Sequence, residues 1–290
     1  MRVFVAGATG AVGRLLVPQL LEAGHHVTGT SRSDAGADRV RSQGADAVQV
    51  DVFDRHALHE ALARTMPDAV IHQLTDLAGA DGQATNRLRR EGTRNLIDAA
   101  KDAGVAKIVV QSIAWVYAPG TGPADEEVPL DSAAAEPRAA MVDGIRTMED
   151  TAGEMESAVA LRYGVLYGPG TWYAPGGSVV AALGGDPDAP FLGSVAADDS
   201  VTSFVHVADA ARAAVDALNW PSGPVNITDD EPARGRDWVP VLAAALHVTA
   251  PDSASGAPAW ARGASNHLAR ARGWRPEYPS WRLGFTEMQP

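Results

Sequence analysis

The sequence predicts an α/β fold in which a doubly wound parallel sheet is joined to a small C-terminal lobe. Three observations lead to this prediction. Apolar, β-branched stretches alternate with helix-like stretches over the first 163 residues, glycines separate the first strand from the first helix, and the periodicity weakens after residue 167. Strands that alternate with helices are typical of a parallel sheet with helices on both faces.

The first strand comprises residues 1–6, and it runs directly into glycines spaced G-x-x-G-x-x-G before a helix begins at Arg14. Glycines in this order allow a tight turn and a close approach of dinucleotide phosphates, which then meet the N–H groups of the first helical turn. We therefore predict a Rossmann-type sheet. A glycine-rich turn without a ligand is the alternative, but the position of the motif directly after an N-terminal strand disfavours this alternative. The expected phosphate-binding residues are Gly7, Thr9, Gly10, Ala11, Val12 and Gly13.

The other elements follow in chain order. Gly24 is a stop signal for the first helix. Short β-branched runs predict strands over 26–31, 47–50, 69–72, 107–112, 158–163 and 225–227, and helix-like stretches cover 54–65, 84–103, 138–153 and 207–219. The prolines and acidic residues of 118–137 predict a loop, and the segment 249–265, rich in Ala, Ser, Pro and Gly, predicts irregular structure.

These elements divide the chain into two parts. Residues 1–166, together with 204–228, are expected to form a dinucleotide-binding domain. Residues 167–203 and 229–290 are expected to form a small substrate-binding lobe. A chain of 290 residues is long enough for one large domain with such a lobe.

Composition excludes several classes of protein. The formal charge of −12 disfavours nucleic acid as a partner, and no apolar stretch reaches the length of a membrane span. Because residues 1–6 are already a core strand, we expect no signal peptide and a cytoplasmic location. The chain has no cysteine, so it has no disulfide and no thiolate metal site. His56, His59 and Glu60 share a helix face without a fourth ligand, and we expect no metal there.

The end of the second predicted strand indicates which dinucleotide is bound. An acidic residue there would bind the ribose hydroxyls of NAD, but the chain has Ser31 and Arg32. A guanidinium flanked by hydroxyls suits a 2′-phosphate, so we expect NADP, with NAD as the alternative. Asp51 ends the third strand, where it would either accept from the adenine amino group or cap a helix.

Beyond the glycines, three motifs carry a family resemblance: residues 112–117 (SIAWVY), 161–170 (LRYGVLYGPG) and 203–209 (SFVHVAD). With the glycine turn, they resemble the extended short-chain dehydrogenase/reductase family, and more narrowly its NAD-dependent epimerase/dehydratase branch. The resemblance runs from residue 1 to about residue 276. It implies further cofactor contacts, which we place at Val52, Gln73, Leu74, Ser112, Tyr163 and Gly164.

The resemblance implies catalytic machinery that this chain lacks. In that family a tyrosine exchanges a proton with the substrate, a lysine four residues later lowers the tyrosine pKa, and a serine or threonine orients the carbonyl. The two lysines of this chain, Lys101 and Lys107, both precede the fifth strand or lie at its start, and no tyrosine has a lysine at the fourth following position. Residues 141–145 (MVDGI) occupy the place of the motif, and the hydroxyl position falls on Ile113.

Other residues must then handle the proton, if one is transferred. Tyr117 is the first candidate, with a ring packed under the substrate loop as the alternative. Ser112 lies one residue before the expected hydroxyl, and Asp143 lies on the helix that should carry the tyrosine. Four aromatic residues are expected to line the substrate pocket and to favour a cyclic or aromatic ligand: Trp115, Tyr167, Trp172 and Tyr173.

Three functions remain open. The leading one is an NADP-dependent oxidoreductase that acts on a small, cyclic or aromatic carbonyl or alcohol, because the cofactor supplies the hydride and the protein supplies position. The second is a cofactor-bound epimerase, dehydratase or isomerase without net redox change, and the third is a non-catalytic dinucleotide sensor. The expected partner is a small-molecule substrate, and a homodimer through helices 84–103 and 138–153 is compatible with the family.

Overall fold

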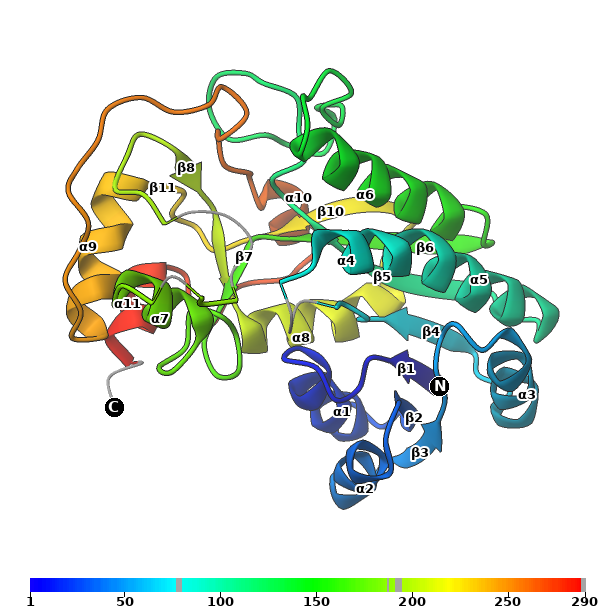
Figure 1. Cartoon of the computed structure of the whole chain (residues 1–290). Helices are drawn as coiled ribbons and strands as arrows, with labels where there is room; N and C mark the ends of the chain where they lie inside the picture. Colours follow the sequence, from blue (N-terminus) through cyan, green and yellow to red (C-terminus); the bar gives the residue numbers. More distant parts are fainter. Residues whose placement is uncertain (77–79, 187, 191–194, 288–290) are drawn as a thin grey trace.

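The computed structural model describes residues 1–76, 80–186, 188–190 and 195–287. A seven-stranded sheet lies at its centre in the order β10-β6-β5-β4-β1-β2-β3, and all neighbouring strands are parallel (Figure 1). Its strands are β1 (Arg2–Ala6), β2 (His26–Ser31), β3 (Asp46–Gln49), β4 (Ala69–His72), β5 (Lys107–Ile113), β6 (Ser157–Tyr163) and β10 (Gly223–Ile227). The predicted fold class is confirmed, and each of these strands lies within two residues of its predicted bounds.

Helices cover both faces of the sheet (Figure 1). One face carries α1 (Gly13–Glu22), α2 (Asp34–Ser42) and α8 (Val207–Asp216), and the other carries α3 (Arg55–Thr65), α5 (Thr93–Asp102) and α6 (Arg138–Ala152). Alternate side chains of each strand point to opposite faces, so Val3 and Val5 pack with the first group of helices while Phe4 packs with the second. This double burial explains why the strand sequences are continuous apolar runs.

The predicted helix over 84–103 consists of three consecutive pieces. These are α4 (Gly82–Arg87), a π-helical segment (Leu88–Gly92) and α5. The Asp81 carboxylate begins α4, because it accepts hydrogen bonds from the Gln83 and Ala84 N–H groups at 2.8 and 3.1 Å. Such π-helical turns inside an α-helix are frequent at functional sites.

The last third of the chain surrounds a separate aromatic cluster. It contains the parallel pair β7 (Val165–Tyr167) and β9 (Phe204–His206) and the antiparallel pair β8 (Val201–Thr202) and β11 (Ala233–Arg234). Helices α7 (Ser178–Leu183), α9 (Gly235–Ala245), α10 (His267–Ala271) and α11 (Trp281–Glu287) and the 3-10 turn Ala217–Asn219 complete the described structure. The Phe204 ring lies 5.1 Å from Trp238 and 5.4 Å from Phe285, both edge-on.

Some of these elements were not predicted: α2, β7, β8, β9, β11, α7, α9, α10 and α11. The expected irregular segment 249–265 contains neither helix nor strand, although Ala264 forms an isolated bridge with Ala124. Among the described residues, no helix is both long enough and apolar enough to cross a membrane.

Candidate active site

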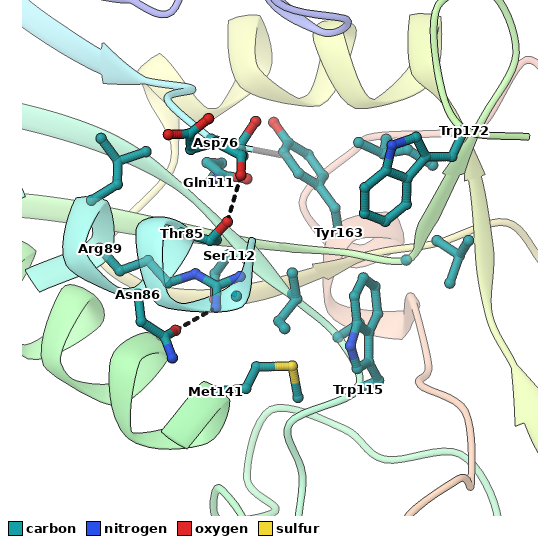
Figure 2. A pocket seen from close by; sticks show the side chains of 18 of the residues that line it. Asp76, Thr85, Asn86, Arg89, Gln111, Ser112, Trp115, Met141, Tyr163 and Trp172 are labelled. Atoms are coloured by element: carbon teal, nitrogen blue, oxygen red, sulfur yellow. Dashed lines mark hydrogen bonds between the residues drawn. The ribbon is translucent and has the colours of Figure 1, made fainter. Parts of the chain in front are cut away.

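A cavity of about 1990 Å³ opens at the carboxyl ends of the sheet strands. It is lined by the β1–α1 turn, by residues at the ends of β2 and β5 and just after β3 and β4, and by residues 170–173, 258 and 260–264. Ligands of open parallel sheets bind at this edge, where the loops that follow the strands converge. Figure 2 shows part of the lining, with residues from α4, the π-helical segment, β5 and α6 facing one space.

Two of the three glycines in the β1–α1 turn are required by the packing of the chain itself. Gly7 has a φ of +94°, and a Cβ there would lie 2.7 Å from the backbone of Gln73. A Cβ on Gly13 would lie 2.1 Å from the Gly7 carbonyl oxygen. At Gly10 a Cβ would approach only that same oxygen, at 3.5 Å, so the space beside Gly10 is open.

The same turn fits the pyrophosphate of a dinucleotide. Gly7, Thr9, Gly10, Ala11 and Val12 line the cavity, whereas Gly13 is buried behind them. No side chain caps the N-terminus of α1. The N–H groups of Arg14, Leu15 and Leu16 donate to the carbonyl oxygens of Gly10 and Val12, so an anion would meet the positive end of the helix dipole beside Gly10. A side chain on Gly10 would fill the open space that a phosphate needs.

The adenosine end of the cavity lies at β2 and β3. Ser31 is held by the next turn, since its hydroxyl accepts from the Ser33 N–H at 3.1 Å. Arg32 is exposed, lines the cavity, and its side chain forms no hydrogen bond or ion pair with any described residue. Asp51 also lines the cavity and accepts from the Phe53 N–H at 2.9 Å. The helix-cap interpretation of Asp51 is wrong, because Asp54 caps α3.

The other predicted cofactor contacts come together along the same edge. Val52, Gln73, Leu74, Ser112, Tyr163 and Gly164 all line the cavity. Gln73 donates from Nε2 to the Tyr163 hydroxyl at 3.0 Å, and that hydroxyl donates to the Ala210 carbonyl at 3.3 Å. Burial raises the pKa of Tyr163, so this phenol is a fixed structural group.

The two hydroxyls predicted to be catalytic belong to one buried network. Ser112 donates from Oγ to Oε1 of Glu149 at 2.6 Å, and Arg162 forms an ion pair with the same carboxylate at 2.6 Å. Arg162 also donates to the Tyr117 hydroxyl at 3.0 Å, and that hydroxyl donates to Oδ1 of Asn226 at 2.6 Å. Each hydroxyl proton is therefore bonded to a protein oxygen.

This network argues against proton transfer by Tyr117. The Tyr117 ring lines the cavity, but its residue is 1% exposed and burial raises its pKa to about 12. A phenol with so high a pKa is a weak acid, and its O–H donates a hydrogen bond to Oδ1 of Asn226. Glu149, the carboxylate that organises Ser112 and Arg162, was not predicted from the sequence.

Two predicted site residues lie elsewhere. Asp143 is on the surface of α6, where it pairs with Arg90 and Arg146, and it does not line the cavity. Its assignment as a catalytic residue is therefore corrected. Tyr167 is fully buried in the aromatic cluster, with its ring 5.2 Å from Phe285, and it is also absent from the cavity lining. Tyr167 is the last and the one buried residue of β7, and it packs in the hydrophobic core.

The remaining predicted aromatic residues do face the cavity. Trp115, Trp172 and Tyr173 line it, and Figure 2 shows Trp172 above Trp115 on the side of the view away from Arg89. Arg138 holds the backbone of this segment, since it donates to the carbonyl oxygens of Trp115 and Tyr117 at 2.7 and 3.1 Å. The arrangement gives the cavity flat apolar walls that suit an aromatic ligand.

A buried arginine in the same space was not predicted at all. Arg89, on the π-helical segment, is 9% exposed and lines the cavity. It donates from Nη1 to Oδ1 of Asn86 at 3.1 Å, while its Nε is buried without a partner among the described residues. No pattern in the sequence distinguishes Arg89 from the neighbouring arginines.

The three residues considered for a metal do not converge. His56 lies 3.3 Å from Glu60 on the exposed side of α3, whereas His59 pairs with Asp102 at 3.2 Å. Within the described part of the chain, no group of three histidines or carboxylates is arranged to hold a metal ion.

Comparison with known proteins identifies the family. The profile of the NAD-dependent epimerase/dehydratase family matches residues 3–228, most of the chain. The chain belongs to the NAD-dependent epimerase/dehydratase family. It is thus an enzyme of the extended short-chain dehydrogenase/reductase type, as the sequence motifs predicted, and its chemistry depends on NAD(P).

Relatives of this family member include a reductase of nearly equal length. The chain is 42% identical to a 3-diazoavenalumate denitrifying reductase from a Streptomyces species, over 98% of this chain and 99% of the relative. A ceramide reductase from Caulobacter vibrioides is 29% identical over 85% of this chain and 70% of the relative. The UDP-glucose 4-epimerase of Thermus thermophilus, solved with NAD, shares the fold with a TM-score of 0.75, 24% identity and 99% coverage of each chain.

The resemblance places Met141 at the family's tyrosine and Ile145 at its lysine. In the structure Met141 lines the cavity and Ile145 is fully buried in the core. Ile113 replaces the hydroxyl that orients a carbonyl. The side chains that would hand a proton to a carbonyl oxygen are therefore apolar here.

Proposed function

We propose that this protein is an NADPH-dependent reductase that replaces the diazo group of a small aromatic compound with hydrogen and releases N2. The observation that carries the proposal is the apolar replacement of the proton-transfer residues, Ile113, Met141 and Ile145. A ketone reductase must deliver a proton to oxygen, but the reductive loss of N2 from carbon requires none. The 42% identity to a denitrifying reductase, over nearly the full length of both chains, supports the same reaction class.

The chemistry balances without an acid. When bound, NADPH supplies a hydride to the ring carbon of an aryl diazonium group and leaves as NADP⁺. A C–H bond forms at that carbon while the C–N bond breaks, and the electron pair of the C–N bond departs with N2. Since no proton is consumed, bonded hydroxyls such as those of Ser112 and Tyr117 do not limit the reaction.

The residues of this chain would then act by position. Trp115 and Trp172 line the cavity with flat apolar surfaces against which an aromatic ring can be oriented. The β1–α1 turn would hold the pyrophosphate beside Gly10. The hydrogen bond between Gln73 and Tyr163 fixes the edge of the sheet between the pyrophosphate and the aromatic side chains. Correct orientation of two reactants is itself a large part of a catalytic rate enhancement.

Preference for NADPH over NADH rests on the end of β2. Arg32 lines the cavity and its side chain has no carboxylate partner among the described residues, so it is available to a 2′-phosphate. A carboxylate at this position would favour the two hydroxyls of NADH, and Ser31–Arg32 supplies none.

The test is to incubate the purified protein with 3-diazoavenalumate and NADPH deuterated at the transferable position of C4. We expect one N2 released and one NADPH oxidised for each substrate, with deuterium at the ring carbon that carried the diazo group, measured by mass spectrometry. NADH should give a lower kcat/KM than NADPH.

Two results would contradict the proposal. One is consumption of NADPH without release of N2, on a panel of ketones, which would indicate a carbonyl reductase. The other is epimerisation of UDP-glucose with no net change in NADPH, which would indicate the redox-neutral chemistry of the more distant epimerases. Assays of both reactions with the same protein preparation make these outcomes distinguishable.

A further inference from the structure

Arg89 differs from the other arginines of its segment. Residues 87–94 contain four arginines, and three of them pair with carboxylates on the protein surface: Arg87 with Glu91, Arg90 with Asp143 and Arg94 with Glu154. Arg89 is the buried one, and no carboxylate among the described residues lies within 4.0 Å of it. A buried charge without a counter-charge is costly, so its presence requires an explanation.

The protein fixes the position of this guanidinium without neutralising it. Asn86 accepts from Nη1 of Arg89 at 3.1 Å and donates from Nδ2 to the Ala140 carbonyl on α6, also at 3.1 Å. Gly144 makes room for this contact, because a Cβ there would lie 2.6 Å from Oδ1 of Asn86. The acceptors of these two hydrogen bonds, the Asn86 amide oxygen and the Ala140 carbonyl oxygen, are both neutral.

The guanidinium is directed to the cavity. Figure 2 shows it pointing into the space near Ser112 and Met141, while Asn86 holds it from the side of α6. Its Nε is buried without a partner among the described residues, so not all of its donors are used by the protein. Burial lowers the pKa of Arg89 to about 10, which still leaves it charged at neutral pH.

None of the described carboxylates that line this cavity forms an ion pair with Arg89. Asp131 forms an ion pair with Arg138 at 2.9 Å, and Asp51 accepts from the backbone near β3. The cofactor's own anionic groups already have candidates, since the pyrophosphate fits the glycine turn and the 2′-phosphate fits Arg32. An anion for Arg89 must therefore come from the second ligand.

We propose that Arg89 binds an anionic oxygen of the substrate, a carboxylate or an aryl oxide, and so selects anionic aromatic compounds. The proposal rests on the proposed function insofar as the ligand is the substrate of this cavity. Guanidinium groups bind such oxygens through charge-assisted hydrogen bonds, and a dry setting strengthens them. The role is one of binding and orientation, next to the place where the family's tyrosine would stand.

The test measures binding of compounds that cannot be reduced, so its result does not depend on the diazo chemistry. The probes are cinnamate, which has only the carboxylate, 4-nitrophenol above its own pKa, which has only the aryl oxide, and methyl cinnamate, which has neither. Quenching of tryptophan fluorescence is titrated in the presence of saturating NADP⁺. The variants are Arg89→Met, Arg89→Lys and, as a matched control, Arg90→Met, which removes an exposed arginine one residue away.

We expect at least one anionic probe to bind the wild type about tenfold or more tightly than Arg89→Met, with Arg89→Lys in between. Methyl cinnamate and NADPH should bind wild type and Arg89→Met equally, and Arg90→Met should match the wild type throughout. Whichever anionic probe loses affinity identifies the oxygen that Arg89 holds.

Equal affinities of both anionic probes for wild type and Arg89→Met would overturn the proposal. So would a loss of NADPH affinity in Arg89→Met with no change for the anionic probes, because Arg89 would then serve the cofactor. Thermal melting separates these results from misfolding: a substrate-binding role predicts that Arg89→Met melts at the wild-type temperature or higher, since an unpaired buried charge has been removed. If Arg89→Met does not fold, the comparison of Arg89→Lys with the wild type decides.

Discussion

At the residue scale, the hydroxyls of this cavity are structural. Tyr117 illustrates this, because its phenol connects Arg162 on β6 with Asn226 on β10 while its ring faces the cavity. Asn226 in turn donates to the carbonyl oxygens of Ala124 and Ser265, so one buried network joins two strands to two loops. A buried polar network with all members bonded gives rigidity to the wall of a site.

We therefore expect Tyr117→Phe to retain diazo reduction within about threefold of the wild type but to lose about 1–3 kcal/mol of unfolding free energy, because Asn226 is left with an unpaired buried oxygen. Steady-state kinetics and urea unfolding measure the two effects. A hundredfold loss of kcat with unchanged stability would instead make Tyr117 the proton donor.

The residues of the site differ in how far a sequence can predict them. The glycine turn and Arg32 are predictable because their role depends on local chain geometry and on a position at the end of a strand. Arg89 and Glu149 are not, because an arginine or glutamate becomes a site residue only when distant segments bury it. Tyr167 shows the reverse case: an aromatic residue beside a predicted pocket turned inward to pack on Phe285.

At the element scale, different glycines of the turn between β1 and α1 serve folding and cofactor binding. Gly13 packs against the Gly7 carbonyl and is needed for the turn itself, whereas the space beside Gly10 is open to a ligand. Two substitutions that add the same methyl group should therefore have different consequences.

We expect Gly13→Ala to lower the melting temperature by several degrees, because its Cβ would lie 2.1 Å from a backbone oxygen that cannot move aside easily. Gly10→Ala should melt within a degree or two of the wild type but bind NADPH at least tenfold more weakly, because its methyl group would occupy the phosphate space. Thermal melting and fluorescence titration with NADPH measure both. The interpretation fails if Gly10→Ala binds NADPH normally or if Gly13→Ala is fully stable.

The strands of the central sheet and the helix α8 were predictable, whereas the other elements after residue 164 were not, for a physical reason. Central strands such as β4 are buried on both faces and are therefore continuously apolar in sequence. By contrast, β8 and β11 have two residues each and are held by contacts between segments far apart in the chain. The π-helical segment was read as ordinary helix, since its altered hydrogen bonding leaves the apolar spacing of the sequence almost unchanged.

At the scale of the whole molecule, the sheet and its helices are joined by buried polar contacts that depend on protonation. His72 ends β4 in the centre of the sheet and is fully buried. Its Nδ1 accepts from the Leu74 N–H at 3.2 Å, so Nε2 carries the proton and donates to Thr93 Oγ1, at the start of α5, at 3.0 Å. The neutral ring satisfies both partners, whereas a protonated ring would direct a second N–H at the Leu74 N–H.

Burial lowers the pKa of His72 from 6.5 to about 4. Between these values the unfolded chain binds a proton that the folded protein does not, so this histidine makes the free energy of unfolding fall as the pH drops from about 6.5 to about 4. The shift corresponds to about 3 kcal/mol across that window.

We expect His72→Asn to be less stable than wild type at neutral pH, with a difference in the free energy of unfolding that narrows by about 3 kcal/mol by pH 4. Urea unfolding at a series of pH values measures the effect, with His56→Asn, an exposed histidine 85% accessible, as the control that keeps the wild-type slope. Parallel curves for wild type and His72→Asn would show that His72 does not contribute to the acid sensitivity of the fold.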